Sequence, residues 1–225
     1  MKKTIILIPV IFVVVLFISV GLRVILSPDF EGFGKNSMSS ESTHLSGSDG
    51  QSGSTSTSFN WKKQPVLIIG DSLTQGAKKE IEKAVGKNAS VDGLTNRTMA
   101  DGLAMLKEKE ANGVLKDNTI IVIALAHNIT GTTVEDAQQI VEMIRPGQSL
   151  IMMTGHGNSY MDPINEYIRS LPRAYSYIAV ADWDMTIAQS PSLLADDNVH
   201  INGKQGNELY ADLILRALEV ARPMP

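Results

Sequence analysis

Two patterns of apolar and polar residues alternate along residues 61–225. Continuous apolar runs of strand length are separated by stretches in which apolar positions recur at helical spacing. Strands are predicted over 65–70, 89–93, 118–125, 148–154 and 175–183. Helices are predicted over 76–86, 99–111, 133–144, 158–171 and 202–221. Since strands buried on both faces form continuous apolar runs, this order predicts a three-layer α/β/α fold around a five-stranded parallel sheet.

The residues best suited to chemistry follow the predicted strands directly. The carboxyl ends of parallel strands meet at one edge of the sheet, and ligands bind outside that edge. After the five strands in turn come Asp71 and Ser72, the loop 93–98, His127 and Asn128, His156, and Asp182 and Asp184. We therefore expect one functional site there.

A different pattern precedes this domain, over residues 1–26. Lys2 and Lys3 come before nineteen uncharged residues, 4–22, which as a helix would span about 28 Å, close to the ~30 Å hydrocarbon core of a bilayer. The positive charges before the span predict a membrane anchor with the rest of the chain outside the cytoplasm. A cleaved signal peptide is the alternative, although the run is long for one and lacks a small-residue cleavage site.

Residues 27–60 are predicted to be a disordered linker between this anchor and a domain over 61–225. The segment is rich in Ser, Thr and Gly, so it cannot bury enough apolar surface to offset its ordering entropy. An anchor, a hydrophilic tether and a globular head would suit a protein that reaches into a cell wall.

Composition narrows the chemistry. The chain of 225 residues has a net charge of −4, which gives no reason to expect nucleic-acid binding. It contains no cysteine, which excludes disulfides, thiolate metal sites and a cysteine nucleophile. Metal binding would need more ligands converging near His127 and His156, so we expect no metal or other cofactor and interpret both as loop residues.

Ser72, taken alone, has two interpretations. A serine where a strand passes into a helix is a common helix cap. It can also be a nucleophile, because the positive end of the following helix favours a developing oxyanion. The surrounding residues do not form the G-x-S-x-G elbow of α/β-hydrolases, since Thr74 takes the place of the second glycine.

Two further polar groups could assist such a serine. Asp197 and His200 stand three residues apart before the last predicted helix, and a carboxylate beside an imidazole can hold a general base in one tautomer. Asp196 is a rival to Asp197 on spacing alone. The side-chain amide of Asn128 could donate to an oxyanion, or Asn128 could simply be a turn residue.

Together, I-G-D-S at 69–72, the Asn after the third strand and D-x-x-H before the last helix resemble the SGNH/GDSL hydrolase family. The resemblance covers residues 65–221 and implies the flavodoxin-like fold of that family. It also implies a catalytic triad of Ser72, Asp197 and His200. The Ser72 N–H and Asn128 would form part of the oxyanion hole.

Two blocks depart from the usual family pattern. The third block, usually G-x-N-D, is A-H-N-I at 126–129. The segment 91–99 resembles V-D-x-x-x-G-R in the extracellular domains of peptidoglycan O-acetyltransferases, with Asn96 in place of the glycine and Arg97 retained. Either Gly93 or Asn96 would then supply the second oxyanion donor. Asp71, Arg97 and His127 are candidates for substrate binding.

These features predict an extracytoplasmic serine esterase or O-acyltransferase for small acyl esters, such as acetyl esters, of cell-wall glycans. Hydrolysis and transfer both remain open. The O-acetyltransferases carry a many-span membrane domain that supplies acetyl groups, whereas this chain has a single predicted span, so a membrane acyl-donor partner is a further expectation. The alternative is a catalytically silent protein of the same fold that binds cell-wall glycans.

Overall fold

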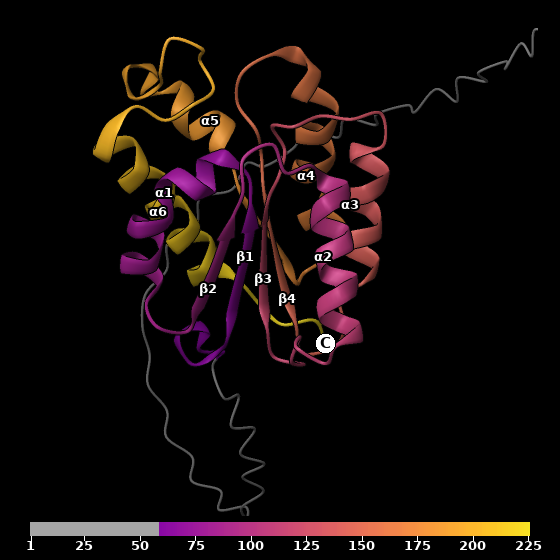
Figure 1. Ribbon diagram of the computed structural model, residues 1–225. Helices are drawn as coiled ribbons and strands as arrows, with labels where there is room; N and C mark the ends of the chain where they lie inside the picture. The colour runs from indigo at the N-terminus through magenta and orange to yellow at the C-terminus, as the bar shows by residue number, and fades with distance from the viewer. Residues whose placement is uncertain (1–58) are drawn as a thin grey trace, which may run out of the picture. The chain divides into compact units, whose positions relative to one another are not determined.

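The structure, a computed structural model, describes residues 59–225. Five parallel strands form one sheet in the order β2-β1-β3-β4-β5 (Figure 1). The strands are β1 (Val66–Gly70), β2 (Ala89–Gly93), β3 (Ile120–Ala124), β4 (Ser149–Met153) and β5 (Ile178–Ala181). Their side chains are almost entirely buried in β1, β3 and β4, as the continuous apolar runs require. The predicted five-stranded parallel sheet is confirmed.

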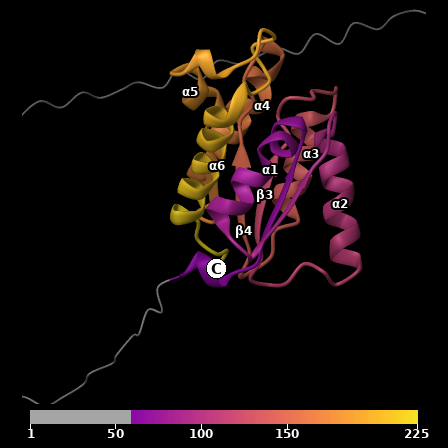
Figure 2. The ribbon, with the colours of Figure 1, turned by 60° about the vertical axis from the view of Figure 1, so that its left-hand side comes forward.

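Helices cover both faces of the sheet, which gives three layers (Figures 1 and 2). One face packs against α1 (Ser72–Val85) and α6 (Gly203–Val220). The other packs against α2 (Met99–Ala111), α3 (Thr133–Glu142) and α4 (Asp162–Ala174). The remaining helices are α5 (Trp183–Ala188) and the short 3-10 helices η1 (Trp61–Lys63), η2 (Ser159–Met161) and η3 (Pro191–Leu193). The sheet therefore lies between two separate apolar cores.

Two element boundaries differ from the prediction for a local reason. Helix α1 begins at Ser72, four residues before the predicted start, because Asp71 caps it and accepts the Leu73 N–H. Strand β5 ends at Ala181, and α5 follows at once because the Asp182 side chain accepts the Met185 N–H. The predicted strand over 175–183 extended into Trp183, the first residue of α5, and this short helix was not predicted.

The expected anchor over 1–26 and most of the expected linker over 27–60 lie outside the described residues. Within 59–225, no helix combines the length and the apolar character needed to cross a bilayer. The same residues contain no cluster of three or more His, Asp or Glu side chains placed to hold a metal ion.

Candidate active site

Ser72, His200 and Asp197 form one chain of hydrogen bonds at the carboxyl edge of the sheet. Ser72 Oγ lies 3.1 Å from His200 Nε2, and His200 Nδ1 lies 2.7 Å from Asp197 Oδ2. A carboxylate only accepts, so Nδ1 carries the proton and Nε2 accepts from the Ser72 hydroxyl. This is the arrangement in which an imidazole can remove the proton of a serine.

Asp197 is oriented by the backbone of its own turn. Its Oδ1 accepts the N–H groups of Val199 and His200, both at 2.9 Å. The hydrogen bond from the His200 ring, followed by those two backbone bonds, lowers the pKa of Asp197 to about 2. Asp197 is therefore ionised at neutral pH, and it is Asp197 rather than Asp196 that contacts the ring.

The turn that carries Asp197 and His200 is closed on itself. Leu194 and Ile201 pair as an isolated antiparallel bridge across its base. Asn198 reverses the chain with a φ of 56°, in the left-handed region that asparagine tolerates better than most residues. The two functional side chains are about half exposed, at 51% and 52%, so solvent and small substrates can reach them.

Ser72 is the first residue of α1 rather than its cap. The N–H groups of the first turn have no acceptor within a helix, and the helix dipole favours negative charge beside them. Two residues further along α1, Thr74 Oγ1 lies 3.0 Å from the hydroxyl of Tyr210 in α6, and both side chains are fully buried. Burial raises the pKa of Tyr210 far above its usual value, so its hydroxyl keeps its proton and ties α1 to α6.

Asn96 lies in a turn directly after β2. The Arg97 N–H donates to the Leu94 carbonyl at 3.2 Å, which closes a four-residue turn with Asn96 at its third position. Asn96 has a φ of 62°, and glycine or asparagine is favoured where the third residue of a turn needs positive φ. Asn96 thus has the left-handed backbone that glycine adopts readily.

Gly93 is less well placed to donate toward Ser72. The Leu94 N–H bonds to the Gly70 carbonyl of β1 at 3.1 Å. Successive N–H groups of a strand point to opposite sides, so the Gly93 N–H points away from β1, the strand that Ser72 follows. A β-carbon at Gly93 would collide with the backbone of α1 at Gln75, which explains the glycine as a packing requirement.

Asn128 reaches the same turn from β3. Its Nδ2 donates to the Arg97 carbonyl at 3.0 Å, and a side-chain amide has a second hydrogen left to donate. Arg97 itself is buried, with its guanidinium bonded to the Gly70 and Asp92 carbonyls and paired with the Asp92 carboxylate at 2.8 Å. Arg97 therefore holds the turn together, and its contact with substrate stays a prediction.

Asp71 and His127 are also bonded within the protein, and their predicted contacts with substrate stay predictions. Asp71 is fully buried and accepts from the Leu73 N–H and from His127 Nδ1, each at 3.0 Å. His127 Nε2 accepts the His156 N–H at 3.1 Å, and the His127 side chain is 6% exposed. With one ring nitrogen donating and the other accepting, His127 links the loops after β1, β3 and β4 and has no nitrogen free for a ligand.

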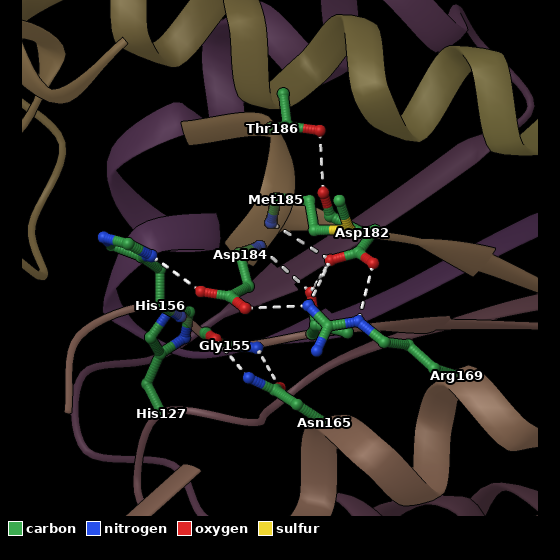
Figure 3. A network of polar contacts seen from close by, with 10 residues as sticks. His127, Gly155, His156, Asn165, Arg169, Asp182, Asp184, Met185 and Thr186 are labelled. Carbon is green, nitrogen blue, oxygen red and sulfur yellow. Dashed lines mark hydrogen bonds and ion pairs between the residues drawn. The ribbon is translucent and has the colours of Figure 1, made fainter. Parts of the chain in front are cut away.

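A network of charged side chains adjoins this link, and the sequence did not reveal it (Figure 3). Arg169 of α4 pairs with Asp182 through Nε at 2.7 Å and with Asp184 through one terminal nitrogen at 2.7 Å. Asp184 in turn bonds His156 Nδ1 at 2.8 Å. Burial raises the pKa of both carboxylates. The hydrogen bonds and charge of Arg169 lower it again, together with hydrogen bonds from Met185 and Thr154 to Asp182 and from His156 to Asp184, so the pKa of each lies below its usual value. In the sequence, the only indication of this network is the presence of polar residues after β4 and β5.

Comparison of the sequence with protein-family models and with curated proteins finds no match. Solved structures do match. The C-terminal catalytic domain of Streptococcus pneumoniae peptidoglycan O-acetyltransferase A is 24% identical with a TM-score of 0.66, over 72% of this chain and 96% of that one. A lipolytic G-D-S-L family protein from Veillonella parvula is 14% identical with a TM-score of 0.58, over 67% and 96% of the chains.

A catalytic mutant of the acetylxylan esterase Axe2 from Geobacillus stearothermophilus is 16% identical to the chain. Its TM-score is 0.52, and the match covers 71% of this chain and 97% of that one. These similarities agree with the motifs at Ser72, Asn128 and the Asp197–His200 turn. Residues 59–225 therefore adopt the fold of the SGNH/GDSL hydrolases, the family that the sequence resembles.

Proposed function

We propose that this protein is a serine esterase or O-acetyltransferase that acts on small acyl esters of cell-wall glycans. The observation that carries the proposal is the Ser72–His200–Asp197 hydrogen-bond chain, with distances of 3.1 and 2.7 Å. The names of two structural neighbours support the substrate class, since one is a peptidoglycan O-acetyltransferase and another is an acetylxylan esterase.

The residues present can carry a complete acyl transfer. His200 Nε2 takes the Ser72 proton as Oγ attacks the ester carbonyl. The alkoxy C–O bond then breaks, His200 returns the proton to the departing alcohol, and the acyl group stays on Ser72. Water or a sugar hydroxyl attacks the acyl-enzyme with His200 again as the base, which transfers the acyl group and restores the serine.

Three donors would stabilise the negative charge on the carbonyl oxygen. They are the Ser72 N–H, the Asn96 N–H and the second amide hydrogen of Asn128. Support comes from the position of Ser72 at the first residue of α1, where an N–H has no acceptor within the helix, from the positive φ of Asn96 and from the Asn128 bond to the Arg97 carbonyl beside it. Removing one such donor typically costs about 10²–10³ in rate.

The site of action belongs to the same proposal. The pattern over residues 1–26, with Lys2 and Lys3 before an uncharged stretch, supports a single-span anchor that leaves the domain outside the cytoplasm. A transferase placed there would need a membrane partner to supply acyl groups, whereas an esterase would not.

A serine-reactive fluorophosphonate probe tests the covalent step. The purified full chain should be labelled on Ser72, and Ser72→Ala and His200→Ala should both lose the label. Incubation with an activated acetyl ester, with and without muropeptide acceptors, then separates hydrolysis from transfer by its products. Absence of labelling and turnover in the folded wild type would favour a silent glycan-binding protein.

A further inference from the structure

His156, a residue of the loop after β4, is held in one orientation by hydrogen bonding at Nδ1 of its ring. Its Nδ1 lies 2.8 Å from Asp184 Oδ1, and the other oxygen of Asp184 is held by Arg169 at 2.7 Å. Arg169 is fixed in turn by two hydrogen bonds to Asp182, at 2.7 and 2.9 Å. Figure 3 shows the His156 ring at the end of this network, so its direction is set by three charged side chains.

The second ring nitrogen of His156 is free. In the part of the chain that the structure describes, Nε2 has no hydrogen-bond partner. Nε2 is also not fully buried, so solvent can reach it. The His156 side chain is 21% exposed. With Nδ1 donating to Asp184, Nε2 of the neutral imidazole presents a lone pair to the surface.

Contacts on both sides place His156 beside the catalytic residues. Its backbone N–H donates to His127 Nε2 at 3.1 Å, and His127 bonds Asp71, the neighbour of Ser72. The next residue, Gly157, packs so closely on Val199 that an added β-carbon would lie 2.9 Å from Val199 Cγ2. His156 therefore lies between the nucleophile loop and the turn that carries His200.

We propose that His156 is a substrate-binding residue whose Nε2 accepts a hydrogen bond from a hydroxyl of the sugar that carries the ester. The inference rests on the proposed function and adds the group that distinguishes a sugar ester from a simple ester. An imidazole held by a carboxylate cannot turn away, so it contributes orientation as well as a hydrogen bond. A substrate without hydroxyl groups gains nothing from it.

The test compares two substrates in the purified full chain. One is an O-acetylated disaccharide, and the other is p-nitrophenyl acetate, which has no hydroxyl. In His156→Ala, the ratio of kcat/KM for the disaccharide to that for the aryl ester should fall about tenfold, as expected for one lost hydrogen bond. His156→Gln, which retains a polar atom near the position of Nε2, should recover part of the ratio. Lys204→Gln on the exposed surface of α6 is the control, with an unchanged ratio.

A binding measurement separates this inference from the proposed chemistry. In a Ser72→Ala background, the disaccharide should shift the Nε2 resonance of His156. Adding His156→Ala should weaken binding severalfold or more, and adding His156→Gln should weaken it less. A purely structural role would reduce both kcat/KM values equally and leave the disaccharide Kd unchanged, which would overturn the inference. Absence of Ser72-dependent turnover in the wild type would refute the proposed function and not this inference, because binding of the disaccharide would still decide the role of His156.

Discussion

The Asp197–His200 and Asp71–His127 pairs make the same hydrogen bond in opposite surroundings. In each, an imidazole Nδ1 faces a carboxylate, at 2.7 and 3.0 Å respectively. The side chains of the first pair are about half exposed, whereas those of the second are 6% and 0% exposed. The other nitrogen differs as well, since His200 Nε2 faces the Ser72 hydroxyl and His127 Nε2 faces a backbone N–H.

The difference shows that an Asp–His pair does not define a function by itself. A serine hydroxyl can give up its proton to an imidazole, while a backbone amide cannot at ordinary pH. His200 is therefore suited to moving a proton, and His127 to joining three loops. Exposure reinforces the distinction, because substrate can reach the first ring and not the second.

The largest expected effect separates the two pairs by activity. His200→Gln should lower kcat for an activated acetyl ester by about 10⁴-fold or more, because the proposed general base is lost. Its free energy of unfolding should change by less than about 0.5 kcal/mol, as for other exposed positions. Rate assays and urea titration of the same preparations measure both.

Asp197→Asn refines that result. If Asp197 mainly orients the ring, its loss in kcat should be smaller than that of His200→Gln, by roughly tenfold or more. Activity near the wild-type level in His200→Gln would instead show that the exposed pair has no catalytic role.

The proposed oxyanion donors give the next effect. Asn96→Gly should keep most activity because glycine also adopts positive φ, whereas Asn96→Val should lose roughly tenfold to a thousandfold in acylation rate. Single-turnover acylation is the measurement. Gly93→Val is not a useful rival variant, because its side chain would collide with α1 whatever the function. Equal, mild effects of both Asn96 variants would mean that this turn does not form the hole.

The sheet and the cluster at its carboxyl edge could be predicted from the sequence because both follow from local patterns. Continuous apolar runs fix the strands, and parallel strands bring their following loops together. The I-G-D-S and D-x-x-H blocks then single out Ser72, Asp197 and His200.

Burial and side-chain partners could not be predicted in the same way. Asp71, Arg97 and His127 are polar residues at the carboxyl edge of the sheet. Nothing in their spacing shows that their polar atoms are bonded within the protein. The network of Arg169 with Asp182 and Asp184 joins α4 to the start of α5. This contact between separate elements leaves no trace in the periodicity of the sequence.

The buried pair should affect stability more than the exposed one does. In His127→Gln the side-chain amide lies near the position of Nε2, so it can still accept from the His156 N–H. It cannot replace the bond from Nδ1 to Asp71, and the buried Asp71 carboxylate loses one hydrogen-bond donor. The free energy of unfolding should fall by about 2 kcal/mol. His127→Asn, whose shorter amide can still reach Asp71, should lose less. Urea denaturation decides, and equal stability of wild type and His127→Gln would show that burial does not distinguish the pairs.

The third pair, Asp184–His156, is intermediate in exposure, at 33% and 21%, so its effect should lie between the other two. Asp184→Asn should lower the free energy of unfolding by about 1 kcal/mol at pH 7, a value already reduced for partial exposure.

The pKa of Asp184 is lowered from 3.8 by Arg169 and His156 against the opposing effect of burial. A lowered folded-state pKa gives stability that is fully present well above the unfolded value and is lost as the pH falls through the folded one. The gap between wild type and variant should therefore be constant near neutral pH and shrink below about pH 4 in denaturation titrations. Asp212→Asn, in an exposed pair with Arg216 on α6, is the control that should show no comparable gap. A gap that widened on acidification would mean that ionised Asp184 does not stabilise the fold.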